Sequence, residues 1–144
     1  MSKLILASHG SLAEGMKSAL KMILGESIHV DAFGLDTWEQ PQAILEEILK
    51  IRRSDPEEEL VVLCDVKGGS VCNCMLQLCT DPKICVVSGM NLGLALELAM
   101  LAGGVSCKEE IKRAIKETNE GIQYFDHTET KRLTETEEEG DALW

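Results

Sequence analysis

Apolar and polar residues alternate along the first 125 residues in a pattern that predicts strands and helices in turn. Short apolar runs, typical of strands, are separated by longer segments whose apolar residues recur every three or four positions, as on one face of a helix. The runs predicted as strands are 3–7, 28–33, 60–64, 84–88 and a short last one, 122–125. The segments predicted as helices are 11–24, 38–52, 70–79, 92–102 and 106–119.

Polar residues at the predicted helix starts support these boundaries. Ser11 with Glu14, and Ser106 with Glu109, have the spacing of a capping box. Asn91 is the expected cap of helix 92–102, which is apolar almost all round. Such a helix must be covered on several sides, so we expect it at a subunit interface.

Strands that alternate with helices predict an α/β fold, a doubly wound and mostly parallel sheet with helices on both faces. The number of strand–helix units favours the flavodoxin-like strand order 2-1-3-4, with the late strand 122–125 added, over the Rossmann order. The folded domain is expected to span residues 1–125. From Asp126 onward Thr and Glu dominate and the apolar periodicity stops, so we expect 126–144 to be an acidic tail without fixed structure or the remnant of a linker.

Composition and net charge limit the classes of partner that the protein can be expected to bind. The 144 residues include 14 Lys and Arg against 25 Asp and Glu, which gives a net charge of −11. This balance argues against nucleic acid or an anionic membrane as the main partner and favours a basic protein. No apolar run approaches the roughly 20 residues that span a bilayer, and the N-terminus lacks the features of a signal peptide. We therefore expect a cytoplasmic protein.

The candidate chemistry lies where the first and third strands end. In an open α/β sheet, ligands bind at the carboxyl ends of the strands where the strand order reverses, here between strands 1 and 3. His9 leaves strand 1 and Asp65 leaves strand 3, so the two face each other. A neutral imidazole has one nitrogen free to attack phosphorus, and a carboxylate on the other nitrogen fixes the tautomer. Backbone N–H groups at the following helix starts favour an anion, and the expected phosphate-binding residues are Gly10, Ser11, Leu12, Gly68, Gly69 and Ser70.

Other interpretations of the same residues stay open at this point. His9 would also fit a solvated turn, with Asp65 as a capping group. The segment from Gly10 to Ser18 nearly matches a phosphate-binding P-loop, but its Lys follows the second Gly by two residues and a helical pattern already occupies the segment. The six Cys contain no CxxC pair, so we interpret them as core residues and expect no metal site.

The two loops together resemble those of the enzyme IIA component of the mannose-family sugar phosphotransferase system. The matching features are Ser-His-Gly after strand 1 and Asp65-x-x-Gly68-Gly69-Ser70 after strand 3. Asn73 and the Ser-Gly-Met-Asn sequence after strand 4 add to the resemblance, which covers roughly residues 1–125. At residues 66–67 the chain has Val-Lys, where the family often has threonine and an aromatic residue.

This resemblance implies a phosphoryl carrier. His9 would be the phosphorylated residue and Asp65 its orienting partner. The donor would be a histidine phosphocarrier protein and the acceptor a IIB component, with the membrane IIC and IID components involved indirectly. No metal, cofactor or nucleic acid is implied. The resemblance also implies a homodimer in which strand 122–125 crosses to the partner's sheet and runs antiparallel to it, with helix 92–102 at the interface.

Two other functions remain as alternatives. The phosphotransfer subunit of the dihydroxyacetone kinase system shares the fold and the strand-1 histidine, but it typically lacks the double-Gly-Ser sequence found here at Gly68–Ser70. A non-catalytic flavodoxin-like binding domain for a flavin or nucleotide would also fit the fold. However, the loop after strand 1 lacks the Ser- and Thr-rich phosphate loop of such domains.

Overall fold

Four parallel strands form one sheet in the computed structural model, which describes residues 2–104 and 107–137. The strand order is β2-β1-β3-β4, and every neighbouring pair is parallel. The central strand β1 pairs through Leu4 with Val30 on one side and Val61 on the other. The predicted order 2-1-3-4 is therefore confirmed. The strands are β1 (Ser2–Ser8), β2 (Val30–Gly34), β3 (Glu59–Cys64) and β4 (Ile84–Ser88).

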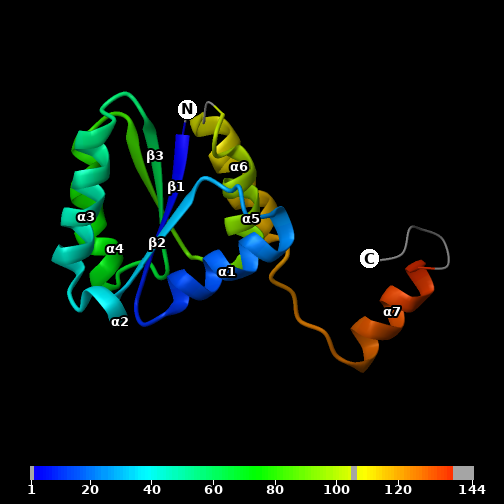
Figure 1. Cartoon of the computed structure of the whole chain (residues 1–144). Helices are drawn as coiled ribbons and strands as arrows, with labels where there is room; N and C mark the ends of the chain where they lie inside the picture. Colours follow the sequence, from blue (N-terminus) through cyan, green and yellow to red (C-terminus); the bar gives the residue numbers. More distant parts are fainter. Residues whose placement is uncertain (1, 105–106, 138–144) are drawn as a thin grey trace.

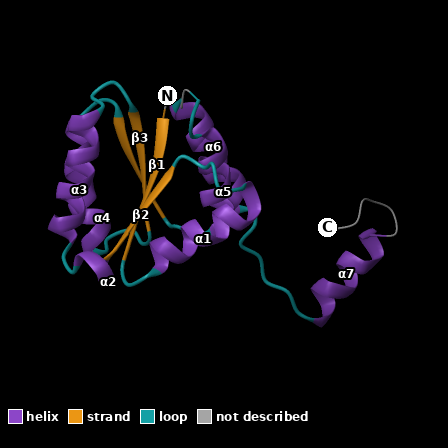
Figure 2. Ribbon diagram, viewed as in Figure 1, coloured by secondary structure: helices purple, strands orange, loops and turns teal. Residues whose placement is uncertain are grey.

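Helices cover both faces of this sheet, as predicted (Figure 1, Figure 2). One face carries α1 (Leu12–Leu24), α5 (Leu92–Leu101) and α6 (Lys108–Asn119). The other face carries α3 (Pro41–Ser54) and α4 (Ser70–Met75), which continues as the 3-10 turn η1 (Leu76–Thr80). The short helix α2 (Leu35–Trp38) connects β2 to α3.

Alternate residues of the central strands supply two separate cores. In β1, Leu4 and Leu6 face one helix layer, whereas Ile5 and Ala7 face the other. Because side chains alternate along a strand, an unbroken apolar run is what a strand covered on both faces requires. Cys64 and Cys72 are buried in the core on the α3 side, which confirms the core interpretation for these two residues. For Cys79 and Cys107 the interpretation is wrong, because both are exposed. Among the described residues, no group of His, Cys, Asp or Glu could hold a metal ion.

The predicted helix 38–52 is in fact two helices. Helix α2 ends at Trp38, Glu39 takes a positive φ of 64°, and α3 begins at Pro41. Proline has no N–H to donate and its fixed φ suits the first helical position, so it starts the second helix rather than continuing the first. The predicted helix 70–79 likewise changes from α-helix to 3-10 geometry after Met75.

The predicted capping box between Ser11 and Glu14 does not form. Ser11 lies at the N-cap position of α1, but its side chain makes no capping hydrogen bond. Ser8 Oγ instead accepts from the backbone N–H of Ala13 at 2.7 Å. Ser106 lies outside the described residues, and the N-cap of α6 is Cys107, whose Sγ accepts from the N–H of Glu110. At α5 the prediction holds, because Asn91 caps the helix.

Residues after α6 differ from the expectation. Residues 122–125 form no strand within the single chain, and Ile122 and Tyr124 are about three-quarters exposed, at 74% and 75%. The expected unstructured tail contains helix α7 (His127–Glu137), which stands apart from the sheet and its helices (Figure 1). Local contacts explain it: Asp126 Oδ1 accepts from the N–H of Glu129, the usual N-cap bond. Residues 138–144 lie outside the described part.

Helix α5 is covered mostly by its own chain. Four of its residues, among them Leu94 and Leu98, are buried in the core that α1 and α6 share with the sheet. Met100 remains exposed. None of the described helices combines the length and the apolar character that crossing a bilayer requires.

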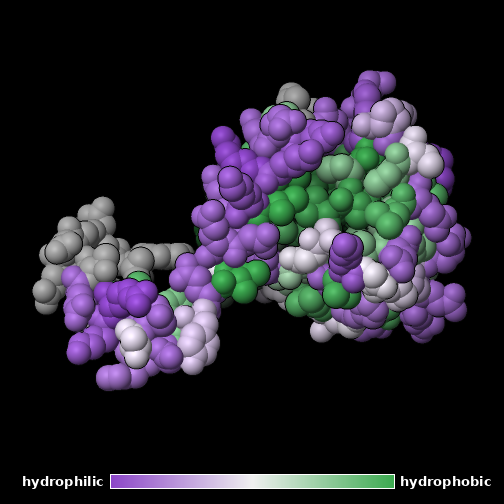
Figure 3. Space-filling model, turned by 180° about the vertical axis from the view of Figure 1, so that it is seen from behind, coloured by the Kyte–Doolittle hydropathy of each residue, from purple (hydrophilic) through white to green (hydrophobic). Residues whose placement is uncertain are grey.

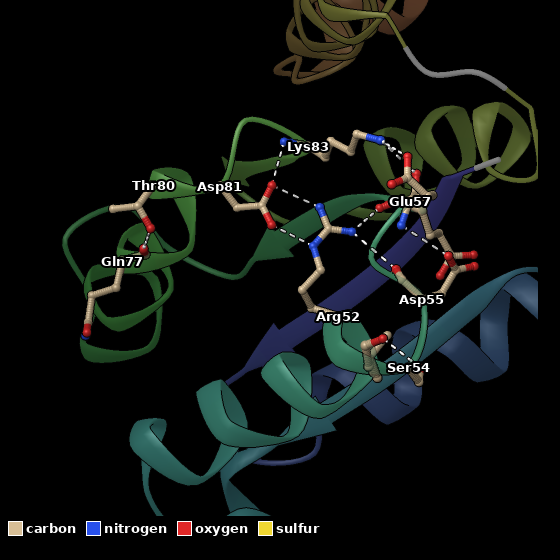
Figure 4. A network of polar contacts seen from close by, with 10 residues as sticks. Arg52, Ser54, Asp55, Glu57, Gln77, Thr80, Asp81 and Lys83 are labelled. Atoms are coloured by element: carbon tan, nitrogen blue, oxygen red, sulfur yellow. Dashed lines mark hydrogen bonds and ion pairs between the residues drawn. The ribbon is translucent and has the colours of Figure 1, made fainter.

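An arginine that the sequence pattern did not single out ties the sheet to α3 (Figure 4). The side chain of Arg52 is 10% exposed, and its Nε and Nη2 donate to the two carboxylate oxygens of Asp81 at 2.6 and 3.0 Å. Its Nη1 donates to the carbonyl of Glu58. The hydrogen bond from Arg52 holds the pKa of Asp81 below its ordinary value. Asp81 and Glu58 precede β4 and β3, so this network fixes the starts of both strands.

Candidate active site

The two predicted site residues meet at the carboxyl edge of the sheet. Because β1 and β3 are hydrogen-bonded neighbours, with Ala7 opposite Cys64, the residues that follow each strand leave the sheet side by side. His9 follows β1 directly, and Asp65 follows β3. This is the switch point of the strand order, since the chain crosses from β1 to β2 on one side and from β3 to β4 on the other.

His9 and Asp65 are joined by two hydrogen bonds to the same carboxylate oxygen. Asp65 Oδ2 lies 2.7 Å from His9 Nδ1 and accepts from the backbone N–H of His9 at 2.8 Å. The carboxylate accepts from Nδ1, which assigns the ring proton to that nitrogen and leaves a lone pair on Nε2. The imidazole side chain is 47% exposed, whereas the Asp65 side chain is only 8% exposed. The imidazole is thus about half exposed, whereas the carboxylate that orients it is buried.

Asp65 is held in its ionised form. Burial of its carboxyl works to raise the pKa, but hydrogen bonds from the backbone and ring of His9 outweigh it, and the pKa lies below its ordinary value. The N–H of Val66 adds a third bond, to Oδ1 at 2.9 Å. A carboxylate that stays charged is what stabilises the cationic ring formed when Nε2 bonds to phosphorus.

The loop after β3 folds over the histidine ring. Ser70 Oγ lies 3.2 Å from His9 Nε2, so with Nδ1 protonated the hydroxyl donates to Nε2. A tight turn at Gly68, with φ of 81°, brings the loop back, and Gly69 N–H donates to the carbonyl of Val66. A Cβ on Gly69 would lie 3.3 Å from His9 Cε1 and 2.8 Å from Val66 Cγ1. A Cβ at this position would have to displace the Val66 side chain and would crowd the ring, so glycine allows the loop its close approach.

Four of the six predicted phosphate-binding residues keep a free backbone donor. Within residues 2–104 and 107–137, the N–H groups of Gly10, Ser11, Gly68 and Ser70 donate to no backbone or side-chain acceptor. The other two are used internally: Leu12 N–H donates to the carbonyl of His9 at 3.4 Å, and Gly69 N–H to that of Val66. Unpaired donors beside an accessible nucleophile suit an incoming anion.

Other contacts that brace the loop were missed by sequence reasoning. Asn73 Nδ2 donates to the carbonyl of Gly68 at 3.2 Å, and Met90 N–H donates to the carbonyls of Cys64 and Asp65, each at 3.1 Å. Both residues belong to segments that carried the resemblance, which was the only signal for them. Val66 is exposed on this loop, and so is Lys67.

Both ring nitrogens of His9 make hydrogen bonds to other side chains, Nδ1 to Asp65 and Nε2 to Ser70. A solvated turn residue without a site role would lack these contacts. An accessible Nε2 lone pair, a charged carboxylate on Nδ1 and free N–H donors together suit attack on phosphorus. Phosphoryl transfer needs little beyond such positioning and charge stabilisation.

Comparisons with known proteins agree with this arrangement. The family described as the PTS system fructose IIA component, EIIA-man, matches residues 3–116. A protein of Klebsiella pneumoniae described as the sorbose-specific EIIA component of the phosphotransferase system (PTS) is 35% identical over 95 residues, 65% of this chain and 70% of that protein. The chain therefore belongs to the IIA components of the sugar phosphotransferase system, and within them to the mannose family.

Solved structures carry the same fold. The mannose/sorbose-specific IIA subunit of Enterococcus faecalis is 32% identical, with a TM-score of 0.68 over 87% of this chain and 95% of that one. The EIIA component of Streptococcus agalactiae is 27% identical, with a TM-score of 0.72 over 87% of this chain and 98% of that one. IIA components of this system act as phosphotransfer carriers, so the chain has a phosphotransferase role.

Proposed function

We propose that His9 is the phosphoryl-carrying residue of this IIA component. It accepts the group from a histidine phosphocarrier protein and passes it to a IIB component for sugar uptake. The observation that carries the proposal is the His9–Asp65 pair at 2.7 Å, with a histidine side chain that is 47% exposed and, among the described residues, only the Ser70 hydroxyl on its other nitrogen. The proposal places the protein in the cytoplasm beside its donor, with the membrane IIC and IID components acting downstream of IIB.

The transfer is an in-line substitution at phosphorus. The lone pair of His9 Nε2 forms the new N–P bond, while the N–P bond of the carrier breaks and its electron pair returns to the carrier's imidazole. The proton on Nδ1 stays in the hydrogen bond to Asp65, which balances the positive charge on the ring. As the donor arrives, Ser70 Oγ–H turns from Nε2 to a phosphoryl oxygen, which frees the lone pair for attack. The N–H groups of Gly10, Ser11, Gly68 and Ser70 stabilise the remaining charge of the phosphoryl group.

The surface around His9 suits a protein donor. Leu12 and Val66 are exposed beside the histidine, at 46% and 51%, and give an apolar rim on which a partner can pack. Acidic residues dominate the chain as a whole, which has a net charge of −11. This charge favours encounter with a basic phosphocarrier.

The homodimer is part of the same proposal. The outer edge of β4 has no neighbouring strand among the described residues, and the groove between β4 and α6 is lined by apolar residues such as Val86, Ile111 and Ile115. An apolar surface lies open at this side of the molecule (Figure 3). An open strand edge is a template for another strand, and segment 122–125 carries exposed apolar side chains with no strand partner of its own. We propose that this segment of each copy fills the groove of the other.

The test is phosphorylation with purified components. The protein is incubated with phosphoenolpyruvate, enzyme I and the phosphocarrier protein, and its intact mass is measured. We expect one acid-labile phosphoryl group that is absent from His9→Ala and present in His29→Ala, a matched control at a histidine outside the site. No addition to the wild-type chain, or an addition that survives His9→Ala, would overturn the proposal.

A further inference from the structure

Glu14 makes a contact that its sequence position does not predict. Three residues after the N-cap of α1, its side chain would normally bond back to the helix start. Instead its Oε1 accepts from the backbone N–H of Gly34, at 3.2 Å. Gly34 is the last residue of β2, so this one side chain joins the first turn of α1 to the end of a neighbouring strand.

The junction at Gly34 is crowded by oxygen atoms. A Cβ on Gly34 would lie 2.3 Å from the carbonyl oxygen of Gly10, 2.6 Å from Glu14 Oε2 and 2.9 Å from Asp36 Oδ1. The φ of Gly34 is −116°, which any residue adopts. Glycine is therefore needed here to let three segments approach one another, and not for an unusual backbone angle.

The same junction holds the peptide that follows the candidate nucleophile. The carbonyl of Gly10 accepts from the N–H of Asp36 at 3.4 Å, and Gly10 has a φ of 52°. On the opposite side, the N–H of His9 donates to Asp65. The turn from His9 to Gly10 is thus held on one side by Asp65, after β3, and on the other by Asp36, at the start of α2 next to Gly34.

The second oxygen of Glu14 gives an independent sign that this contact is not ordinary helix capping. Oε2 is buried and has no hydrogen-bond partner in the part of the chain that the structure describes. A buried acceptor without a partner is unfavourable and uncommon in native proteins. An alanine would remove that cost, but it would also remove the bond to Gly34.

We propose that Glu14 is a positioning residue for phosphoryl transfer at His9. Its carboxylate locks the end of β2 against the start of α1, and the contact between Asp36 and Gly10 passes this restraint to the His9–Gly10 turn. Asp65 fixes one ring nitrogen, and the restrained backbone fixes the direction from which Nε2 meets phosphorus. The role is positional, because a carboxylate charge near a phosphoryl dianion would oppose the transfer. This inference rests on the proposed phosphoryl transfer to His9.

The test compares three substitutions at this residue. Glu14→Gln keeps an oxygen for Gly34 N–H and supplies an amide donor for the surrounding oxygens. Glu14→Ala removes the bridge, and Glu14→Asp keeps the charge but shortens the reach. Glu117→Ala, which removes an exposed acid on α6, is the matched control.

We expect Glu14→Ala and Glu14→Asp to lower the maximal rate of phosphorylation by about 10- to 100-fold, because small misplacement of a reacting atom has effects of this size. The carrier concentration at half-maximal rate should stay unchanged. Glu14→Gln and Glu117→Ala should remain near the wild-type rate. Circular dichroism checks folding, and if Glu14→Ala does not fold, Glu14→Asp decides.

A second measurement needs no phosphoryl donor. Nitrogen-15 NMR of the His9 ring should show the proton on Nδ1 in the wild type and in Glu14→Gln. In Glu14→Asp the loosened His9–Gly10 turn should move the ring away from Asp65, which weakens the Nδ1 bond that fixes the tautomer and gives a mixture of tautomers. Wild-type rates and an unchanged ring spectrum in folded Glu14→Ala and Glu14→Asp would overturn the inference, as would an equal loss in Glu14→Gln. If the wild-type chain takes no phosphoryl group, the proposed function fails, and the ring spectra still decide whether Glu14 positions His9.

Discussion

Replacing Asp65 by asparagine separates the charge of the orienting group from its shape. The two side chains have the same size, so the loop after β3 can keep its path. The carboxylate accepts three hydrogen bonds: two through Oδ2 from the backbone and ring of His9, and one through Oδ1 from the N–H of Val66. An asparagine has a single oxygen, and its NH2 group can only donate.

Neither orientation of the new amide satisfies all three donors. With its oxygen toward His9, the NH2 group opposes the N–H of Val66. With its oxygen toward Val66, the NH2 group faces both His9 donors and favours the tautomer with the proton on Nε2, the nitrogen that must attack. A hydrogen bond to a charged group contributes about 1.5–3 kcal/mol, so its loss at the cationic ring corresponds to a rate about 10- to 150-fold lower.

The assay is single-turnover phosphorylation by the phosphocarrier protein, followed by rapid quench and intact mass. Asp31→Asn is the matched control, because Asp31 is a β2 residue paired with Lys3 and lies outside the site. We expect the control to react at the wild-type rate and Asp65→Asn to lose rate while keeping its circular dichroism spectrum. A rate within about twofold of wild type in folded Asp65→Asn would refute the orienting role of the carboxylate.

Three further predictions concern stability. The pKa of Asp65 in the folded state lies below its ordinary value. Its contribution to the free energy of unfolding is therefore complete above the ordinary pKa and is lost as pH falls through the lowered one. The difference in free energy of unfolding between wild type and Asp65→Asn, measured in urea, should shrink from neutral pH toward strong acid. Arg52→Ala should lower Tm by at least about 5 °C, because it leaves the carboxylate of Asp81 and a backbone carbonyl without their donor. Arg52→Lys should recover only part of the loss, since an ammonium cannot form the paired bonds. Equal Tm values of Arg52→Ala and wild type in calorimetry would contradict this prediction. Gly34→Ala should destabilise the fold by about 1–3 kcal/mol, because its Cβ would overlap the carbonyl of Gly10, and unchanged urea unfolding would show that the junction is softer than its distances indicate.

The sheet was predictable because each of its strands has a local signal in the sequence, a short apolar run. The run 60–64 is apolar without interruption, and a strand covered on both faces needs nothing else. The predicted helix boundaries were wrong where a single residue changed the direction of the backbone. Glu39 takes a left-handed conformation and Pro41 restarts the helix, and apolar periodicity carries no signal for either event. Helix α7 was missed because its stabilising contacts are polar and lie within one or two turns.

The sequence predicted the two principal residues of the candidate site and the loop residues beside them, but not the contacts that hold those loops in place. His9 and Asp65 each follow an apolar run, so the rule for strand ends brings them together without any knowledge of side-chain contacts. Glu14 was assigned a capping role from its spacing to Ser11, and its actual partner is 20 residues away in sequence. Long-range pairs of this kind leave no periodic mark, so a single sequence does not reveal them.

The distribution of these contacts predicts two kinds of loss on mutation. The strand ends beneath the site are fixed by the cores, where Ala7 and Cys64 are fully buried. Above them, the His9–Gly10 turn is held by polar contacts: hydrogen bonds to Asp65 on one side and one from Asp36 on the other. Substitutions in the cores should therefore lower stability and activity together. Substitutions at Glu14 should lower the transfer rate far more than the stability, because its restraint acts on the direction of one ring and not on the packing of the fold. Substitutions at Asp65 should lower both, because its carboxylate orients the ring and also accepts two backbone N–H bonds.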